Sequence, residues 1–285
     1  MKIPKRLQPL VNAQMIEDVL GQLQSGKEAE VYIVQAEGRL CCAKIYKDAK
    51  NRSFKQKTQY TEGRKVRGSR RARAMESGSR YGREEREAEW QNTEVDALYH
   101  LAAAGVRVPQ PLGYYEGVLL LQMITDAEGQ PAPRLSDVEL TPELARHYHS
   151  VLVRETVKML CAGLIHGDLS EFNVLVSQDG LVIIDLPQAI QATANNAFGL
   201  FERDVDQLAA YFGRVAPEIL DTRYAKEIWK HFENGRLKPD TPLTGQFQES
   251  GRKANVKAVL DEIEDAREDE MMRRGLRKKP DSNRE

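Results

Sequence analysis

A polar break between two apolar runs constrains this sequence more than any other feature. The stretch GLIHGDLSEFNVLV (163–176) places His166, Asp168 and Asn173 in this break. A second short apolar run, LVIID, follows a polar turn and ends at Asp185. Turn residues between short apolar runs predict two strands with a loop before them. Two carboxylates and an amide thus lie next to the ends of these predicted strands.

Strand patterns dominate the first half of the chain. Residues 28–47 predict two strands joined by a turn at Glu37 and Gly38. Apolar residues at steps of three and four predict a helix over residues 84–104, and residues 106–124 return to strand composition.

Helical patterns dominate the second half, with a helix expected over residues 142–162 and two or more helices over residues 198–232. The composition of residues 125–137 predicts a linker before these helices. Together the two halves predict an α+β, two-lobed fold. The predicted divisions are an N-lobe over residues 1–124, a C-lobe over residues 125–240, and a charged C-terminal helix with its tail over residues 250–285.

The segment over residues 48–86 is strongly basic. From Lys44 to Arg86 the chain has 15 Lys and Arg against 5 Asp and Glu. Weak apolar periodicity favours a long flexible or partly helical insertion. It has two interpretations: a solvated insertion without a function, or a surface over residues 50–86 that contacts RNA or a ribosomal particle.

Cysteine usage and hydropathy exclude several classes of protein. Cys41, Cys42 and Cys161 have no CxxC spacing, which argues against a disulfide framework and a structural zinc site. The N-terminal residues contain no apolar h-region, and no run of about 18 apolar residues occurs. We therefore expect a cytoplasmic protein without a membrane segment.

The polar residues match the requirements of phosphoryl transfer from ATP. That reaction needs a cation near the phosphates, hard oxygen ligands for metal ions, and a carboxylate that accepts a proton. In chain order, Lys44, Glu94, Asp168, Asn173 and Asp185 follow the general protein-kinase plan. In that plan Glu94 pairs with Lys44, Asp168 is the base, and Asn173 and Asp185 hold Mg²⁺.

Each of these residues has a plainer interpretation when taken alone. Lys44 could be a surface lysine of a strand, and Asp168 and Asp185 could be turn or cap residues. Glu94 is one of several glutamates in its helix, but it lies near the apolar face, where a carboxylate needs a partner. His166 is better interpreted as a structural histidine that braces the loop than as a base.

These residues carry a resemblance to the RIO family of atypical serine/threonine protein kinases, over roughly residues 20–215. The segments that carry it are SGKEAEVY (25–32), AKIYK (43–47), QPAP (130–133), HGDLSEFNVLV (166–176), IIDLPQ (183–188) and the basic FKQKTQYTEGRKVR (54–67). The combination is specific, although no single segment is.

The resemblance implies a trimmed bilobal kinase fold that binds ATP with Mg²⁺, or Mn²⁺ in its place. Its phosphate loop has few glycines, so Ser25 and Lys27 are expected to contact phosphates, and the linker position of Met123 and Ile124 suggests that they hold the adenine. The DFG triplet of ordinary protein kinases is replaced here by DLP (185–187), and no APE motif follows. In this family the aspartate that matches Asp185 is proposed to accept phosphate itself, in an ATPase cycle.

The function that we predict is ATP- and Mg²⁺-dependent phosphoryl transfer to Ser or Thr of proteins, including autophosphorylation, and ATP hydrolysis. Two alternatives stay open: a small-molecule phosphotransferase, and an ATP-switched binding module on a ribosomal particle or RNA. Few residues precede the phosphate loop, so the chain resembles the shorter branch of the family, without a winged helix, or a bacterial relative.

Overall fold

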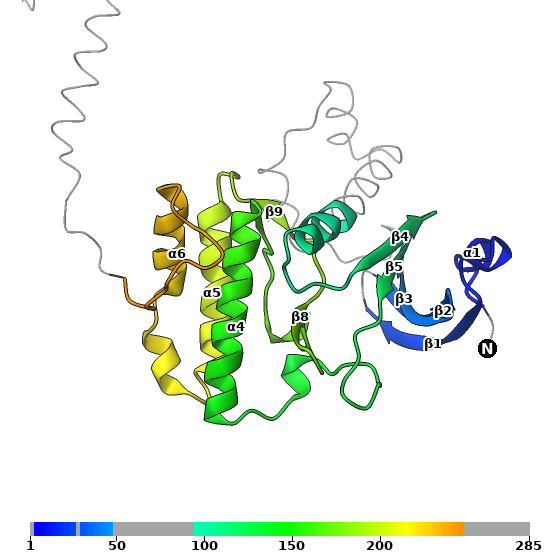
Figure 1. Ribbon diagram of the computed structural model, residues 1–285, viewed down its shortest axis with the longest axis horizontal. Helices are drawn as coiled ribbons and strands as arrows, with labels where there is room; N and C mark the ends of the chain where they lie inside the picture. Colours follow the sequence, from blue (N-terminus) through cyan, green and yellow to red (C-terminus); the bar gives the residue numbers. More distant parts are fainter. Residues whose placement is uncertain (1–2, 27–28, 48–93, 248–285) are drawn as a thin grey trace, which may run out of the picture. The chain divides into compact units, whose positions relative to one another are not determined.

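The structure, a computed structural model, describes residues 3–26, 29–47 and 94–247 (Figure 1). Three sequence predictions lie outside these residues: a phosphate contact of Lys27, the basic insertion over residues 48–86 with its RNA or ribosome contact, and the charged helix and tail over residues 250–285. They stay predictions. In the described part of the chain, no helix is long and apolar enough to cross a membrane.

A five-stranded antiparallel sheet forms the N-terminal half, with the strand order β1-β2-β3-β5-β4 (Figure 1). A short helix precedes the sheet, and a second helix lies between its third and fourth strands. The elements are α1 (Gln8–Asn12), β1 (Asp18–Ser25), β2 (Ala29–Ala36), β3 (Arg39–Tyr46), a helix whose described part covers residues 94–103, β4 (Pro111–Tyr115) and β5 (Val118–Gln122).

Tight turns connect the hairpins of this sheet. Glu37 and Gly38 both have positive φ, 51° and 70°, and join β2 to β3 in the register that pairs Ala36 with Arg39. Glu116 and Gly117 repeat this geometry between β4 and β5. Two successive positive φ values match the right-handed twist of a two-residue hairpin. The turn predicted at Glu37 and Gly38 is thus confirmed.

Both faces of the central strands are covered, and this coverage fixes where Lys44 lies. Ala43 and Ile45 of β3 pack in a cluster with Leu7 and Leu10 near α1. Tyr46 belongs instead to the cluster that includes the helix over residues 94–103. Because side chains alternate along a strand, Lys44 shares the face of Tyr46, towards that helix.

Helices dominate the C-terminal half. Helix α4 begins after Thr141, whose hydroxyl accepts a hydrogen bond from the Leu144 amide at 3.2 Å, and Pro142 occupies its first position. The elements are η2 (Leu135–Asp137), α4 (Pro142–Cys161), β6 (Leu164–Ile165), η3 (Glu171–Asn173), β7 (Val174–Ser177), β8 (Gly180–Ile183), β9 (Ile190–Gln191), α5 (Ala197–Phe212), η4 (Pro217–Asp221) and α6 (Tyr224–Glu233). The helices predicted over residues 142–162 and 198–232 are confirmed.

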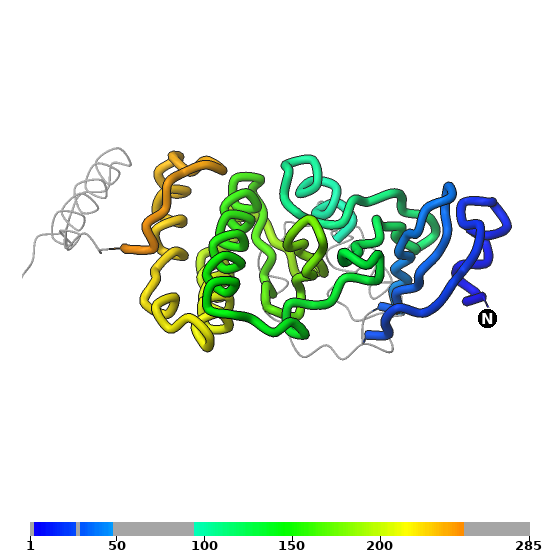
Figure 2. Tube along the Cα trace, turned by 60° about the horizontal axis from the view of Figure 1, so that its bottom comes forward, coloured from blue at the N-terminus to red at the C-terminus, as the bar shows by residue number. Residues whose placement is uncertain are grey.

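One hydrophobic cluster joins the two halves. It includes Leu98 and Leu101 from the helix between β3 and β4, Leu152 from α4, and Leu186 near the polar loop. Within residues 3–246, Figure 2 shows the N-terminal strands at one end and helices α4, α5 and α6 at the other. The cluster therefore holds the polar residues of β3 and of the loop after α4 against one another.

The predicted division between the lobes at residues 124 and 125 falls just after β5. There the Ile124 carbonyl accepts a hydrogen bond from the Ala132 amide at 3.0 Å, and Thr125 pairs with Pro131 in an isolated bridge. The linker is therefore a folded-back loop.

Candidate active site

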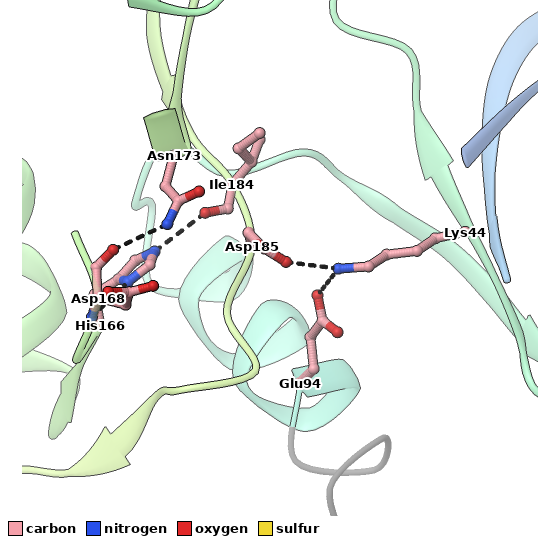
Figure 3. A network of polar contacts seen from close by, with 7 residues as sticks. All are labelled: Lys44, Glu94, His166, Asp168, Asn173, Ile184 and Asp185. Carbon is pink, nitrogen blue, oxygen red and sulfur yellow. Dashed lines mark hydrogen bonds and ion pairs between the residues drawn. The ribbon is translucent and has the colours of Figure 1, made fainter. Parts of the chain in front are cut away.

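Lys44 joins two carboxylates that are distant in sequence (Figure 3). Its Nζ donates to Glu94 Oε1 at 2.5 Å and to Asp185 Oδ1 at 2.9 Å. The side chains of Lys44 and Glu94 are 12% and 5% exposed, whereas that of Asp185 retains 46% exposure. The pairing predicted for Lys44 and Glu94 is confirmed, and Asp185 is the member of the group that a ligand can reach.

The charges of this group support one another. Burial acts to lower the pKa of Lys44, but the carboxylates of Asp185 and Glu94 outweigh it and raise the pKa above its ordinary value. In return, the Lys44 ammonium holds the pKa of Asp185 below its ordinary value, although partial desolvation acts to raise it. Both groups are therefore charged at neutral pH, as a site for metal and phosphate requires.

The backbone turns sharply at Asp185. The sequence predicts a strand over residues 181–185, but β8 ends at Ile183. The Ile184 amide donates to the Asn173 carbonyl at 2.9 Å, and Asp185 adopts a left-handed conformation with φ 67°. A non-glycine residue in this region is uncommon and is often found at functional sites. The early end of the strand lets the Asp185 carboxylate reach Lys44.

A hydrogen-bonded loop places His166, Asp168 and Asn173 on the other side of Asp185 (Figure 3). Asn173 Nδ2 donates to the Asp168 carbonyl at 2.9 Å. His166 Nδ1 accepts from the Asp168 amide at 3.3 Å, and its Nε2 lies 3.1 Å from the Ile184 carbonyl, to which it donates. His166 is 2% exposed. It thus braces the loop, as the sequence predicts, through both ring nitrogens.

The Asp168 carboxyl has the electrostatic setting of a proton acceptor. Burial raises its pKa, and the nearby charge of Asp185 adds to this effect, while His166 and Arg203 oppose it. A carboxylate with a raised pKa accepts a proton more readily than an ordinary surface aspartate. This setting fits the base predicted at position 168.

Asp204 of α5 holds the loop that carries Asp168, and this role was not predicted from the sequence. Its carboxylate oxygens accept hydrogen bonds from the amides of Gly167 at 2.7 Å and Leu169 at 3.1 Å. Arg203 donates to the Gly167 carbonyl. Gly167 has φ 80°, and a Cβ there would lie 2.6 Å from the Gln188 carbonyl oxygen. The loop that carries Asp168 is therefore fixed by a buried carboxylate and an obligatory glycine.

The buried carboxyl of Asp204 predicts a pH dependence of stability. Burial raises its pKa from 3.8 to about 6, against the opposing effect of His166. Because the folded state then binds this proton more tightly than the unfolded state, the contribution of Asp204 to the free energy of unfolding falls as pH rises from about 4 to about 6, by at most ~3 kcal/mol. Urea unfolding of the unaltered protein and of Asp204→Asn measures the difference across this window. A difference that does not change with pH contradicts the prediction.

The predicted nucleotide contacts of the N-lobe are described only in part. Ser25 ends β1, and its hydroxyl accepts from Lys47 Nζ at 3.3 Å. Met123 follows β5 and is 8% exposed. The Ile124 carbonyl is already bonded to the Ala132 amide, so the groups that we expect to bind adenine are the Met123 backbone and the Ile124 amide.

The residues present fit a hard divalent cation better than a zinc ion. In the described part of the chain, no group of three His, Cys, Asp or Glu side chains could hold a metal. Asp185 and Asn173 offer a carboxylate and an amide oxygen, and Asn173 keeps its Oδ1 available because Nδ2 makes the bond to Asp168. Mg²⁺ is commonly bound by one or two protein oxygens together with phosphates and water.

Comparison with known proteins identifies the family. The RIO domain family model matches residues 30–225, more than half of the chain. The chain belongs to the RIO family. The resemblance of the sequence motifs to this family is thus confirmed.

Two RIO proteins illustrate the similarity. The serine/threonine-protein kinase rio1 of Schizosaccharomyces pombe is 27% identical over 274 residues, which are 90% of this chain and 52% of that protein. The RIO-type serine/threonine-protein kinase Rio1 of Haloferax volcanii is 37% identical over 127 residues, 44% of this chain and 42% of that protein. The chain spans about half the length of these curated relatives.

A solved structure supports the fold. The crystal structure of the Rio2 kinase–ADP/Mg²⁺–phosphoaspartate complex from Chaetomium thermophilum matches with a TM-score of 0.55 at 20% sequence identity, over 93% of this chain and 81% of that one. At this identity the similarity concerns the fold. The predicted α+β, kinase-like fold of the RIO type is therefore confirmed.

Proposed function

We propose that this chain binds ATP with Mg²⁺ and transfers the terminal phosphoryl group to Ser or Thr of proteins, itself included. The observation that carries the proposal is the arrangement around Asp185, whose carboxylate pairs with Lys44 at 2.9 Å. The backbone next to it is hydrogen-bonded to Asn173. The names of the RIO relatives, which are serine/threonine-protein kinases, support the same reaction class.

In this proposal Lys44 binds phosphate oxygens of the nucleotide. Glu94 keeps the lysine extended, because the ion pair at 2.5 Å is almost fully buried and leaves the ammonium little freedom. A positioned cation of this kind neutralises charge that develops on the phosphates during transfer. Met123 and Ile124 hold the adenine at the linker, and Ser25 and Lys27 contribute to the phosphate loop.

Asp185 and Asn173 supply the protein oxygens for Mg²⁺. Bound Mg²⁺ would neutralise and orient the phosphates. Asp168 accepts the proton of the attacking hydroxyl, and its loop is fixed through His166, Asn173 and Asp204 before any ligand binds. Preorganisation of this kind lowers the barrier because little reorganisation remains to be done.

A second outcome of the same site is ATP hydrolysis through Asp185. The Rio2 complex from Chaetomium thermophilum contains ADP, Mg²⁺ and a phosphoaspartate. We propose that a carboxylate oxygen of Asp185 forms a bond to the terminal phosphorus while the bond to ADP breaks, and that water then releases phosphate. The exposed carboxylate of Asp185 supports this role.

Incubation with ATP radiolabelled on its γ-phosphate tests the proposal. We expect label on the protein that requires Mg²⁺, is lost with a chelator, and is found on Ser or Thr after acid hydrolysis. A fraction that hydroxylamine removes would report the acyl phosphate on Asp185. ATP labelled on its α-phosphate is the control and should leave no label. Absence of both Mg²⁺-dependent labelling and ATP hydrolysis would contradict the proposal.

A further inference from the structure

Lys47 is a second lysine of the N-lobe, and the function proposed above does not use it. It follows β3 directly, three residues after Lys44. Its Nζ donates to the Gly26 carbonyl at 2.8 Å and to Ser25 Oγ at 3.3 Å. The Glu30 carboxylate lies 3.7 Å from the same ammonium. Lys47 thus contacts both described sides of the loop between β1 and β2.

The described part of this loop differs from a glycine-rich phosphate loop. In such a loop, backbone amides point to the phosphates. Here the Gly26 amide already donates to the Ala29 carbonyl at 2.9 Å, and the Gly26 carbonyl accepts from Lys47. Both polar backbone groups of Gly26 are therefore engaged within the protein. Gly26 therefore offers no free backbone donor to a phosphate, and its position depends on the side chains that hold it.

The geometry of Lys47 suits this task. An ammonium has three donors, and those of Lys47 face a carbonyl, a hydroxyl and a carboxylate within one short loop. The Lys47 side chain is 27% exposed, so the charge is neither buried nor free in solvent. Glu30 is also held from the other side, since the Tyr32 hydroxyl donates to its Oε2 at 3.0 Å.

We propose that Lys47 is a positioning residue that holds the phosphate loop through Ser25 and Gly26 and thereby determines affinity for the polyphosphate part of the nucleotide. This inference rests on the proposed function. In the proposed function Lys44, which is paired with Glu94 and Asp185, binds phosphate oxygens of the same nucleotide. Lys44 and Lys47 thus have separate roles: Lys44 lies between the carboxylates of Glu94 and Asp185, and Lys47 lies at the loop.

Calorimetric titration of Lys47→Met with Mg-ATP and with adenosine tests this inference. We expect the Kd for ATP to increase about tenfold, as expected for the loss of a charge-assisted hydrogen bond, with little change for adenosine. In turnover, the KM for ATP should rise while kcat at saturation stays within about twofold of the unaltered enzyme. Lys47→Arg, which keeps the charge and the donors, should restore most of the affinity.

Lys230→Met is the matched control, because Lys230 of α6 is 58% exposed and its partner Glu233 lies on the same helix. It should bind ATP as the unaltered chain does. Unchanged ATP affinity in Lys47→Met, or an equal loss for ATP and adenosine, would overturn the inference. Failure of the unaltered chain to bind ATP would instead contradict the proposed function, and the inference with it.

Discussion

Replacement of Asp168 by alanine is expected to reduce phosphoryl transfer by about 10²-fold or more, because the acceptor hydroxyl loses its positioned proton acceptor. Binding of Mg-ATP should persist, since Asn173 is bonded to the backbone carbonyl of Asp168, which alanine retains. The measurement is the single-turnover transfer rate together with the Kd of Mg-ATP.

Asp168→Asn is the informative companion variant. It preserves the shape of the side chain but is far too weak a base to accept the proton, so its transfer rate should fall as far as that of Asp168→Ala. If either variant labels itself at the rate of the unaltered protein, Asp168 is not the base. If both also lose Mg-ATP binding, its role is structural.

Replacement of Asp185 by asparagine is expected to have the second large effect. The variant should lose Mg²⁺-dependent ATP affinity and about 10²-fold or more of the transfer rate, because one of the two protein ligands for the cation loses its charge. Any hydroxylamine-sensitive phosphate should disappear with it. Lys44 keeps Glu94 as its partner, so the fold should tolerate the change.

Lys44→Met would be a less selective test than Asp185→Asn, because it leaves the Glu94 carboxylate buried without its cation.

Asp179→Asn makes the same chemical change at an exposed aspartate between β7 and β8 and is the matched control. It should bind Mg-ATP and transfer phosphate at the unaltered rate. Asp185→Asn with normal metal-dependent affinity would show that Asp185 is not a ligand. A similar loss in Asp179→Asn would point to a general effect of surface charge.

The parts of the site that local sequence could predict are those with short-range or compositional signals. The hairpin at Glu37 and Gly38 required positive φ, which glycine tolerates, and it set the register that places Lys44 opposite Val31. Glu94 could be chosen among the glutamates of its segment because Val95 and Leu98 mark the buried face of that helix. The prediction of one shared site for Lys44 and Asp185 depended on the order of residues along the chain, because nothing local links them.

The features that the sequence did not reveal either contact residues distant in the chain or show no periodic hydrophobic pattern. Strand β1 is exposed at most of its positions as an edge strand, so it shows no alternation. Asp204 is bonded to a loop about 36 residues earlier and looks like any polar residue of an amphipathic helix. Lys47 follows a strand end, and only the folded hairpin brings it to Ser25 and Gly26. Each of these contacts is set by tertiary structure.

A crystal structure with a non-hydrolysable ATP analogue and Mn²⁺ tests the central claim most directly, because anomalous scattering locates the metal. We predict an anomalous peak bound by Asp185 and Asn173, with Lys44 on the phosphates and Asp168 facing the terminal phosphate. A metal bound elsewhere, or a nucleotide placed away from Lys44, would contradict the account.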